Sequence, residues 1–154
     1  MKKILATAIG LVLGISFLLA EAWPPFSDLL WKMDINGDKR ISRSEWKGDA
    51  DRFQLCNVDG NAFLTQGEYD RTAKDYADNY DQGLDEFEMF LTRPMDQDHD
   101  QKVSAAEFTS YPNPYGGAPV AFADLDKNKD GFVTAEEFAA WFARETLKAQ
   151  RGIH

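Results

Sequence analysis

The sequence has little cysteine, little histidine and no excess of basic residues. One cysteine and two histidines occur among its 154 residues. A single cysteine excludes an intramolecular disulfide framework, so another factor must stabilise the fold. Cys56, His99 and His154 form no nucleophile–base pair with recognisable spacing, which argues against an enzyme. The 26 acidic residues outnumber 17 basic ones, for a net charge of −9, and phosphates of nucleic acid or anionic membrane would repel that charge.

The composition is nevertheless sufficient for a folded core. The hydrophobic fraction is 44% and the aromatic fraction is 13%, which are too high for a disordered acidic tail. The length limits the chain to one domain or two very small ones. Cations are the natural electrostatic complement of such a chain.

The N-terminal segment resembles an export signal. Lys2 and Lys3 precede an uncharged run over 4–20, and residues 20–22 read Ala-Glu-Ala. This pattern predicts a signal peptide over 1–22, cleaved after Ala22, and a periplasmic or secreted protein. The run exceeds the usual signal core of about 7 to 15 residues but is shorter than the roughly 20 of a spanning helix. An uncleaved anchor, which would make the chain a membrane-tethered module, is therefore the alternative.

Twelve-residue segments recur four times, over 34–45, 57–68, 96–107 and 126–137, here called loops 1 to 4. Each has oxygen-bearing side chains at positions 1, 3, 5 and 9 and Glu at position 12, the spacing with which a coiled loop surrounds Ca²⁺ with six to eight oxygens. Position 7 offers its backbone carbonyl. The predicted ligands are Asp34, Asn36, Asp38, Arg40 and Glu45; Asn57, Asp59, Asn61, Phe63 and Glu68; Asp96, Asp98, Asp100, Lys102 and Glu107; and Asp126, Asn128, Asp130, Phe132 and Glu137.

Residues outside the ligand set follow the same register. Position 8 is always apolar (Ile41, Leu64, Val103, Val133), which predicts a short antiparallel bridge between paired loops. Position 9 is always Ser or Thr, three residues before the Glu, so each loop also spells the capping box of an outgoing helix. The residue before loop 2 is Cys56, and this place at a helix end favours a small buried side chain over a reactive or dimer-forming thiol.

Over about residues 27–147 the chain resembles the EF-hand superfamily, in particular small secreted EF-hand proteins of bacteria with calmodulin-like loops. The resemblance implies an all-α fold of four helix-loop-helix units in two pairs, with Ca²⁺ as the cofactor. After the signal peptide, we expect one pair over 23–80 and a second over 81–154.

The loops depart from the family pattern at position 6. The usual glycine there is Lys39, Ala62 and Gln101 in loops 1 to 3, and only loop 4 keeps it, as Gly131. A side chain at this left-handed position costs roughly 1 kcal/mol. Loop 2 also has amides in place of carboxylates at positions 1 and 5. We therefore expect two to four bound ions, with loop 4 tightest, loops 3 and 1 next, and loop 2 weakest.

The segments between loops predict local structure. A short helix is expected on either side of Gly48, and two helical patterns over 69–95 are expected to connect the pairs. Pro94 is expected to end the helix before loop 3. The stretch 111–119 contains three prolines and two glycines, and is expected to form a loop.

The sequence favours a calcium buffer or calcium-stabilised structural module. The alternative is a sensor that exposes an apolar groove to an unidentified protein partner; Trp31, Trp46, Trp141 and Phe142 would suit such a groove, but their helical spacing favours core packing. Transition-metal binding through His99 and His154 is a weaker hypothesis, and no catalytic residue is predicted.

Overall fold

The computed structural model describes residues 23–111 and 120–153. The predicted signal peptide, its cleavage point at Ala22, most of the 111–119 linker and His154 therefore lie outside the described residues. The elements are α1 (Phe26–Met33), β1 (Ile41–Ser42), α2 (Ala50–Cys56), β2 (Phe63–Leu64), α3 (Gln66–Glu86), the π-helix η1 (Phe87–Thr92), α4 (Arg93–Met95), β3 (Val103–Ser104), α5 (Ala105–Ser110), α6 (Phe122–Leu125), β4 (Phe132–Val133) and α7 (Ala135–Gln150). The fold is therefore mostly α-helical, as predicted.

The loops pair as their position-8 residues predict. β1 is antiparallel to β2 with Ile41 opposite Leu64, and β3 is antiparallel to β4 with Val103 opposite Val133. All four side chains are fully buried. Each bridge therefore joins two neighbouring loops, and its two position-8 side chains belong to the hydrophobic cluster beneath them.

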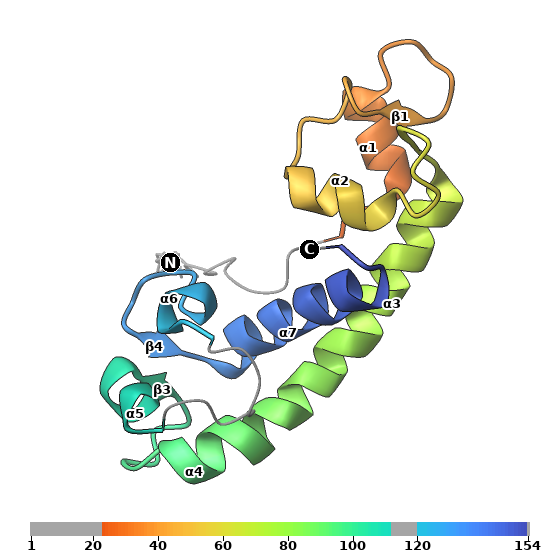
Figure 1. Ribbon diagram of the computed structural model, residues 1–154. Coiled ribbons are helices and arrows are strands. Elements are labelled where there is room, and N and C mark those ends of the chain that lie inside the picture. The colour runs from red at the N-terminus through yellow and green to blue at the C-terminus, as the bar shows by residue number, and fades with distance from the viewer. Residues whose placement is uncertain (1–22, 112–119, 154) are drawn as a thin grey trace, which may run out of the picture.

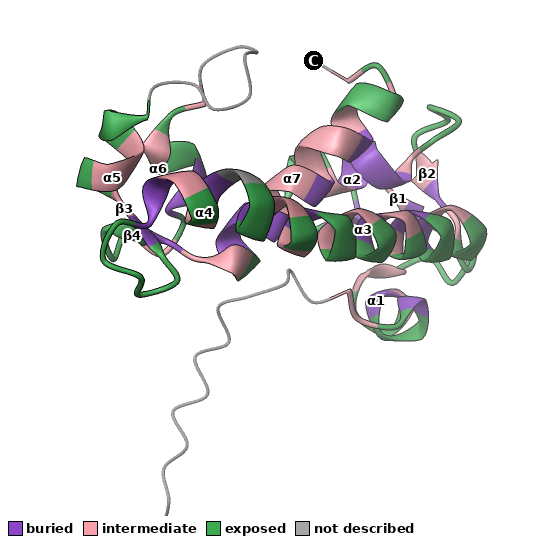
Figure 2. Ribbon diagram, turned by 90° about the horizontal axis from the view of Figure 1, so that it is seen from below, coloured by how far each residue is buried: buried purple, intermediate pink, exposed green. Residues whose placement is uncertain are grey.

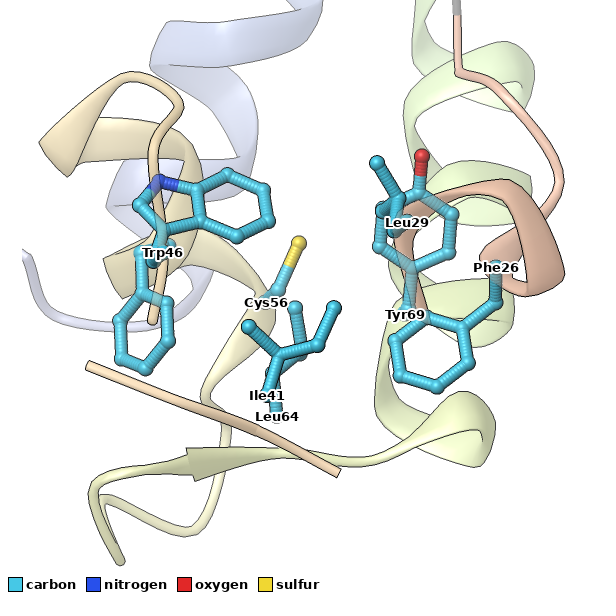
Figure 3. Packing of buried hydrophobic residues seen from close by; sticks show 8 residues of the cluster. Phe26, Leu29, Ile41, Trp46, Cys56, Leu64 and Tyr69 are labelled. Atoms are coloured by element: carbon cyan, nitrogen blue, oxygen red, sulfur yellow. The ribbon is translucent and has the colours of Figure 1, made fainter. Parts of the chain in front are cut away.

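The first cluster lies under loops 1 and 2. It contains Phe26, Leu29, Ile41, Trp46, Phe53, Cys56, Leu64 and Tyr69. Figure 3 shows the Cys56 sulfur among apolar side chains from separate elements. Burial raises the pKa of this thiol to about 12, because an apolar setting disfavours the thiolate. The prediction of a buried Cys56 is confirmed.

The second cluster lies under loops 3 and 4. It contains Phe87, Leu91, Met95, Val103, Leu125, Val133 and Phe138. Trp141 and Phe142 are partly buried and pack against it, as their spacing predicted. Trp31 differs, because 83% of it is exposed on α1, and its assignment to the core was wrong.

The segment between the pairs is one continuous helical run from Gln66 to Met95, formed by α3, η1 and α4. Pro94 does not end it, contrary to the prediction; the Asp96 N–H still donates to the Thr92 carbonyl at 3.1 Å. The π turn explains the difference, because proline lacks an N–H and its ring needs extra space on the preceding turn. The helix therefore delivers Asp96 directly to the start of loop 3.

No regular helix follows loop 1, contrary to the expectation of helices on both sides of Gly48. Residues 43–45 form only a turn. Trp46 Nε1 donates to the Asp49 carbonyl at 2.7 Å, and a Cβ on Gly48 would lie 2.8 Å from the Trp46 ring. Asp49 already caps α2 by accepting from the Asp51 N–H. The chain therefore folds around Trp46 and begins the next helix before an outgoing helix can extend.

Helices α3 and α7 bring the two pairs together. Figure 1 shows α7 running beside α3, with α1 and α2 near one end of α3 and β3 and α5 near the other. Gly83 permits the close crossing, since a Cβ there would lie 2.8 Å from Ala139 Cα. A third cluster, of Leu55, Tyr76, Ala143 and Leu147, joins α2, α3 and α7. Figure 2 shows these helices turning buried residues toward one another.

Within the described parts of the chain, no helix combines the length and the apolar character needed to cross a membrane.

Candidate metal centres

Each loop is organised by hydrogen bonds from its backbone to its own oxygen-bearing side chains. The position-3 side chain accepts from the position-5 N–H at 2.7 to 3.2 Å. The position-5 side chain accepts from the position-7 N–H at 2.8 to 2.9 Å. These hydrogen bonds coil the chain. Each accepting oxygen keeps a second lone pair, and each aspartate also has a second oxygen, so acceptor sites remain for a ligand.

The position-1 carboxylates of loops 1, 3 and 4 hold the same turn together. Asp34, Asp96 and Asp126 each accept from the N–H groups of positions 5 and 6, at 2.9 to 3.2 Å. Asp96 and Asp126 are buried despite their charge. A buried carboxylate needs several donors or a cation to offset the loss of hydration.

The position-12 glutamates close the loops. In all four, Oε2 accepts from the N–H of the position-9 residue at 2.8 to 3.1 Å and from its hydroxyl at 2.6 to 3.2 Å. The Ser42 hydroxyl and N–H hold the pKa of Glu45 below its ordinary value, and the Ser104 N–H lowers the pKa of Glu107. Glu45 and Glu107 therefore stay ionised, the form that a metal ion requires.

In loops 1, 3 and 4 the other glutamate oxygen folds back over the start of the loop. Glu45 Oε1 accepts from the Ile35 N–H at 3.0 Å, Glu107 Oε1 from the Gln97 N–H at 2.8 Å, and Glu137 Oε1 from the Asn128 N–H at 3.2 Å. The glutamate at position 12 thus lies close to the first residues of the loop, as is required if the ligands are to surround one ion.

Loop 3 brings its carboxylates closest together. Ligand oxygens of Asp96, Asp98 and Glu107 lie within 4.8 Å of one another. Three negative charges at this distance repel strongly, and a divalent cation among them removes that cost. All oxygen donors suit a hard ion such as Ca²⁺ rather than a soft metal.

Loop 2 differs because two of its predicted ligand atoms have no partner. Asn57 Oδ1 and Glu68 Oε1 are buried and meet no hydrogen-bond donor at normal distance and angle. Burial acts to raise the pKa of Glu68, but Thr65 and the Asp59 N–H lower it overall. Buried acceptors without partners are rare and costly, and these two occupy positions 1 and 12. Loop 2, for which the sequence predicts the lowest calcium affinity, thus has two buried oxygen atoms that a bound cation would coordinate.

Two positions in every loop, not one, adopt left-handed backbone. Position 6 has positive φ in Lys39, Ala62, Gln101 and Gly131, as predicted, and position 4 has it in Gly37, Gly60, His99 and Lys129. Sequence reasoning missed position 4, although glycine occurs there in two loops. Loop 3 has no glycine at either position, whereas each other loop has one. Loop 3 therefore has the largest backbone strain as well as the most carboxylates among its predicted ligands, four.

The remaining predicted site residues lie in the loops as expected. The position-7 residues Arg40, Phe63, Lys102 and Phe132 lie next to or within the β-bridges. Arg40 stacks over the Phe63 ring at 4.4 Å, and Lys102 lies 5.3 Å from the Phe132 ring centre. Their side chains therefore interact across each pair, while their carbonyls remain the predicted ligands.

Comparisons with known proteins agree with this geometry. Residues 120–143, which span loop 4, match the family model described as EF hand. The chain is 34% identical over 74 residues to calcium-binding protein G of Dictyostelium discoideum. The match covers 45% of this chain and 43% of that protein, so it extends over less than half of either one.

Proposed function

We propose that this chain is a member of the EF-hand superfamily, that it binds Ca²⁺ through its four loops, and that it serves as an exported calcium buffer or calcium-stabilised structural module. The observation that carries the proposal is the convergence of Asp96, Asp98 and Glu107 within 4.8 Å. Loops 1 and 4 share the hydrogen-bond pattern of loop 3, and loop 2 has unpartnered ligand atoms. Four sites are therefore proposed, within a range of two to four bound ions.

The loop holds its carboxylates close together, so that their mutual repulsion is relieved when a cation binds, and this relief contributes to the binding free energy. Side chains at positions 1, 3, 5 and 12 and the position-7 carbonyl would hold the ion, which would supply two positive charges at the centre of each loop. A site filled at 100 times its dissociation constant stabilises the folded state by about 2.7 kcal/mol. This contribution is large for a chain with a total stability of about 5 to 15 kcal/mol.

The packing of the two pairs favours a buffer or structural module over a sensor. A sensor needs an apolar surface that opens when calcium binds, whereas Leu55, Tyr76, Ala143 and Leu147 are buried in one cluster between the pairs. The sensor stays an alternative because of the exposed apolar side chains of Trp31, Ile35, Val58 and Met89. A protein partner would dock there.

A calcium titration tests the proposal and separates its two forms. Calorimetry is expected to detect at least two ions per chain, and a dye that binds exposed apolar surface is expected to bind less as calcium is added. More dye binding with calcium would instead support the sensor. No heat of binding at any calcium concentration would refute calcium binding itself.

Export and the absence of catalysis complete the proposal. The basic start and apolar run over 1–22 support cleavage after Ala22 and a periplasmic or secreted location. Intact mass of the exported protein distinguishes cleavage from a retained anchor. We propose no enzymatic role, because the loop carboxylates are accounted for as ligands and His99 lies exposed at position 4 of loop 3.

A further inference from the structure

Helix α7 extends from loop 4 to the N-terminal pair. Its third residue is the predicted loop 4 ligand Glu137, which forms the capping box of the helix with Thr134. Near its other end, Ala143 and Leu147 are fully buried against Leu55 of α2 and Tyr76 of α3. One rigid helix thus touches a ligand of loop 4 at its first turn and the N-terminal pair at its last.

Arg151, the residue after α7, makes the polar part of this contact. Its guanidinium donates to the Leu55 carbonyl and pairs with Asp75 Oδ2 at 3.3 Å. The Arg151 side chain is 14% exposed and that of Asp75 is 38% exposed, so the guanidinium is largely shielded from water, whereas the carboxylate of the pair is partly solvated. Lys148 Nζ adds a weaker pair with Asp51 Oδ2 at 3.5 Å.

The Leu55 carbonyl belongs to the last turn of α2, where carbonyls have no partner inside the helix. A cation at this end also interacts favourably with the helix dipole. Arg151 therefore acts as a C-terminal cap for α2, although it comes from 96 residues further along the chain.

Helix α2 leads directly into loop 2, whose first predicted ligand is Asn57. Asn57 follows Leu55 by two residues, and its Oδ1 is buried without a partner. In the other loops a position-1 carboxylate accepts at least two N–H bonds that fix its place. Since Asn57 Oδ1 accepts none, its place depends more on the end of α2, and so on Arg151.

We propose that Arg151 is a positioning residue for loop 2 and that α7 couples calcium binding in loop 4 to calcium binding in loop 2. The inference rests on the proposed calcium binding of both loops. Filling loop 4 fixes Glu137 and the start of α7, and the docked end of α7 holds α2 so that Asn57 meets the ion. Filling loop 4 thus raises the affinity of loop 2.

Glycine-selective ¹⁵N labelling of the protein provides a test, because Gly60 reports on loop 2 and Gly131 on loop 4. The amide shift of each is followed during a calcium titration. Glu137→Gln is expected to abolish the Gly131 response and to raise the calcium midpoint at Gly60 at least fivefold, the lower end of usual coupling. Arg151→Met is expected to raise the Gly60 midpoint by a similar factor, and adding Glu137→Gln to it causes no further shift.

Two further variants distinguish positioning from a general loss of stability. Arg151→Lys keeps a donor and is expected to recover part of the loop 2 affinity. Arg144→Met removes a charge that pairs with Glu145 on α7 itself, and is expected to leave Gly60 unchanged.

The coupling is refuted if Gly60 keeps its midpoint in Glu137→Gln, or if Arg151→Met shifts Gly60 and Gly131 equally. If neither glycine of the unmodified protein responds to calcium, the proposed function fails, and the coupling with it.

Discussion

The left-handed residues at positions 4 and 6 set the strain of each loop. Loops 1, 2 and 4 place glycine at one of the two positions, whereas loop 3 places His99 and Gln101 there with φ of 62° and 66°. Each side chain in this conformation costs about 1 kcal/mol. Loop 3 therefore combines the most carboxylates with the most strain, and the two effects oppose each other in its calcium affinity.

Replacing Gln101 by glycine is expected to strengthen loop 3. The change removes about 1 kcal/mol of backbone strain from the coiled loop. Because ordering of the loop is coupled to metal binding, this corresponds to up to about fivefold tighter calcium binding. Gln97→Gly is the matched control, because Gln97 lies in the same loop without positive φ. It only adds flexibility to the unfolded chain and is expected to weaken the loop slightly. Calorimetric titration of both variants measures the difference, and equal affinities would contradict the strain argument.

Cys56 is expected to be unreactive in the folded protein. Burial raises its thiol pKa to about 12 from 9.0, so at pH 8 very little reactive thiolate forms. A thiol-specific reagent should modify Cys56 only as fast as the N-terminal pair opens, and calcium should slow it further. Immediate labelling of the native protein would contradict this burial.

The same pKa shift predicts a loss of stability at high pH. A raised pKa means that the folded state holds the thiol proton more tightly than the unfolded state does. This stabilisation is fully present below pH 9.0 and is lost as the pH rises toward about 12. Denaturant unfolding of Cys56→Ser is expected to show a weaker decline over that range than the unmodified protein.

Residue-scale features that repeat could be predicted from the sequence, whereas those set by a single neighbour could not. The buried position-8 residues Ile41 and Val103 followed from recurrence alone. The strain at His99 was missed because position 4 varies between loops. Trp31 was placed in the core because its helical spacing fits, but α1 buries Phe26 and Leu29 instead.

At the scale of elements, capping boxes start helices only where the chain has room to continue. Thr65, Ser104 and Thr134 begin α3, α5 and α7 through capping boxes. Ser42 and Glu45 make the same hydrogen bonds, yet only a turn over 43–45 follows, because Asp49 already caps α2. A local signal therefore predicted the turn, and the nearby start of the next helix decided its length.

Gly83→Ala is expected to destabilise the protein although alanine favours helices. Alanine at an exposed helical site gains up to about 1 kcal/mol over glycine. At Gly83 the new Cβ would lie 2.8 Å from Ala139 Cα, which is backbone and cannot turn aside. The overpacking cost of about 1 to 3 kcal/mol exceeds the gain. Denaturant unfolding measures the net loss.

Gly67→Ala is the matched control on the same helix. Gly67 lies in the first turn of α3, and a Cβ there meets nothing within 4 Å. This variant is expected to be neutral or more stable by up to about 1 kcal/mol. If both alanine variants gained stability equally, the close crossing of α3 and α7 would be disproved.

At the scale of the whole molecule, the contact between the two pairs was beyond the reach of sequence reasoning. The expected boundary between residues 80 and 81 falls inside α3, a helix that packs along α7. Nothing local to Leu55 or Arg151 indicates that they meet across 96 residues. Recurrence predicts each loop and its partner, but the contacts between pairs depend on side chains that occur once.

The net charge of −9 makes the folded state depend on the kind of cation present. The carboxylate oxygens of loop 3 lie within 4.8 Å of one another, which is shorter than the screening length of about 10 Å in 0.1 M salt. Sodium chloride therefore weakens their repulsion only slightly, whereas bound Ca²⁺ removes it. Each site filled at 100 times its dissociation constant adds about 2.7 kcal/mol, or about 5 to 10 °C in melting temperature. Thermal unfolding followed by circular dichroism should show this rise in melting temperature with calcium and its reversal by a chelator. Sodium chloride at equal ionic strength should change the melting temperature little. An equal rise with sodium chloride would mean that general screening, rather than site binding, stabilises the fold.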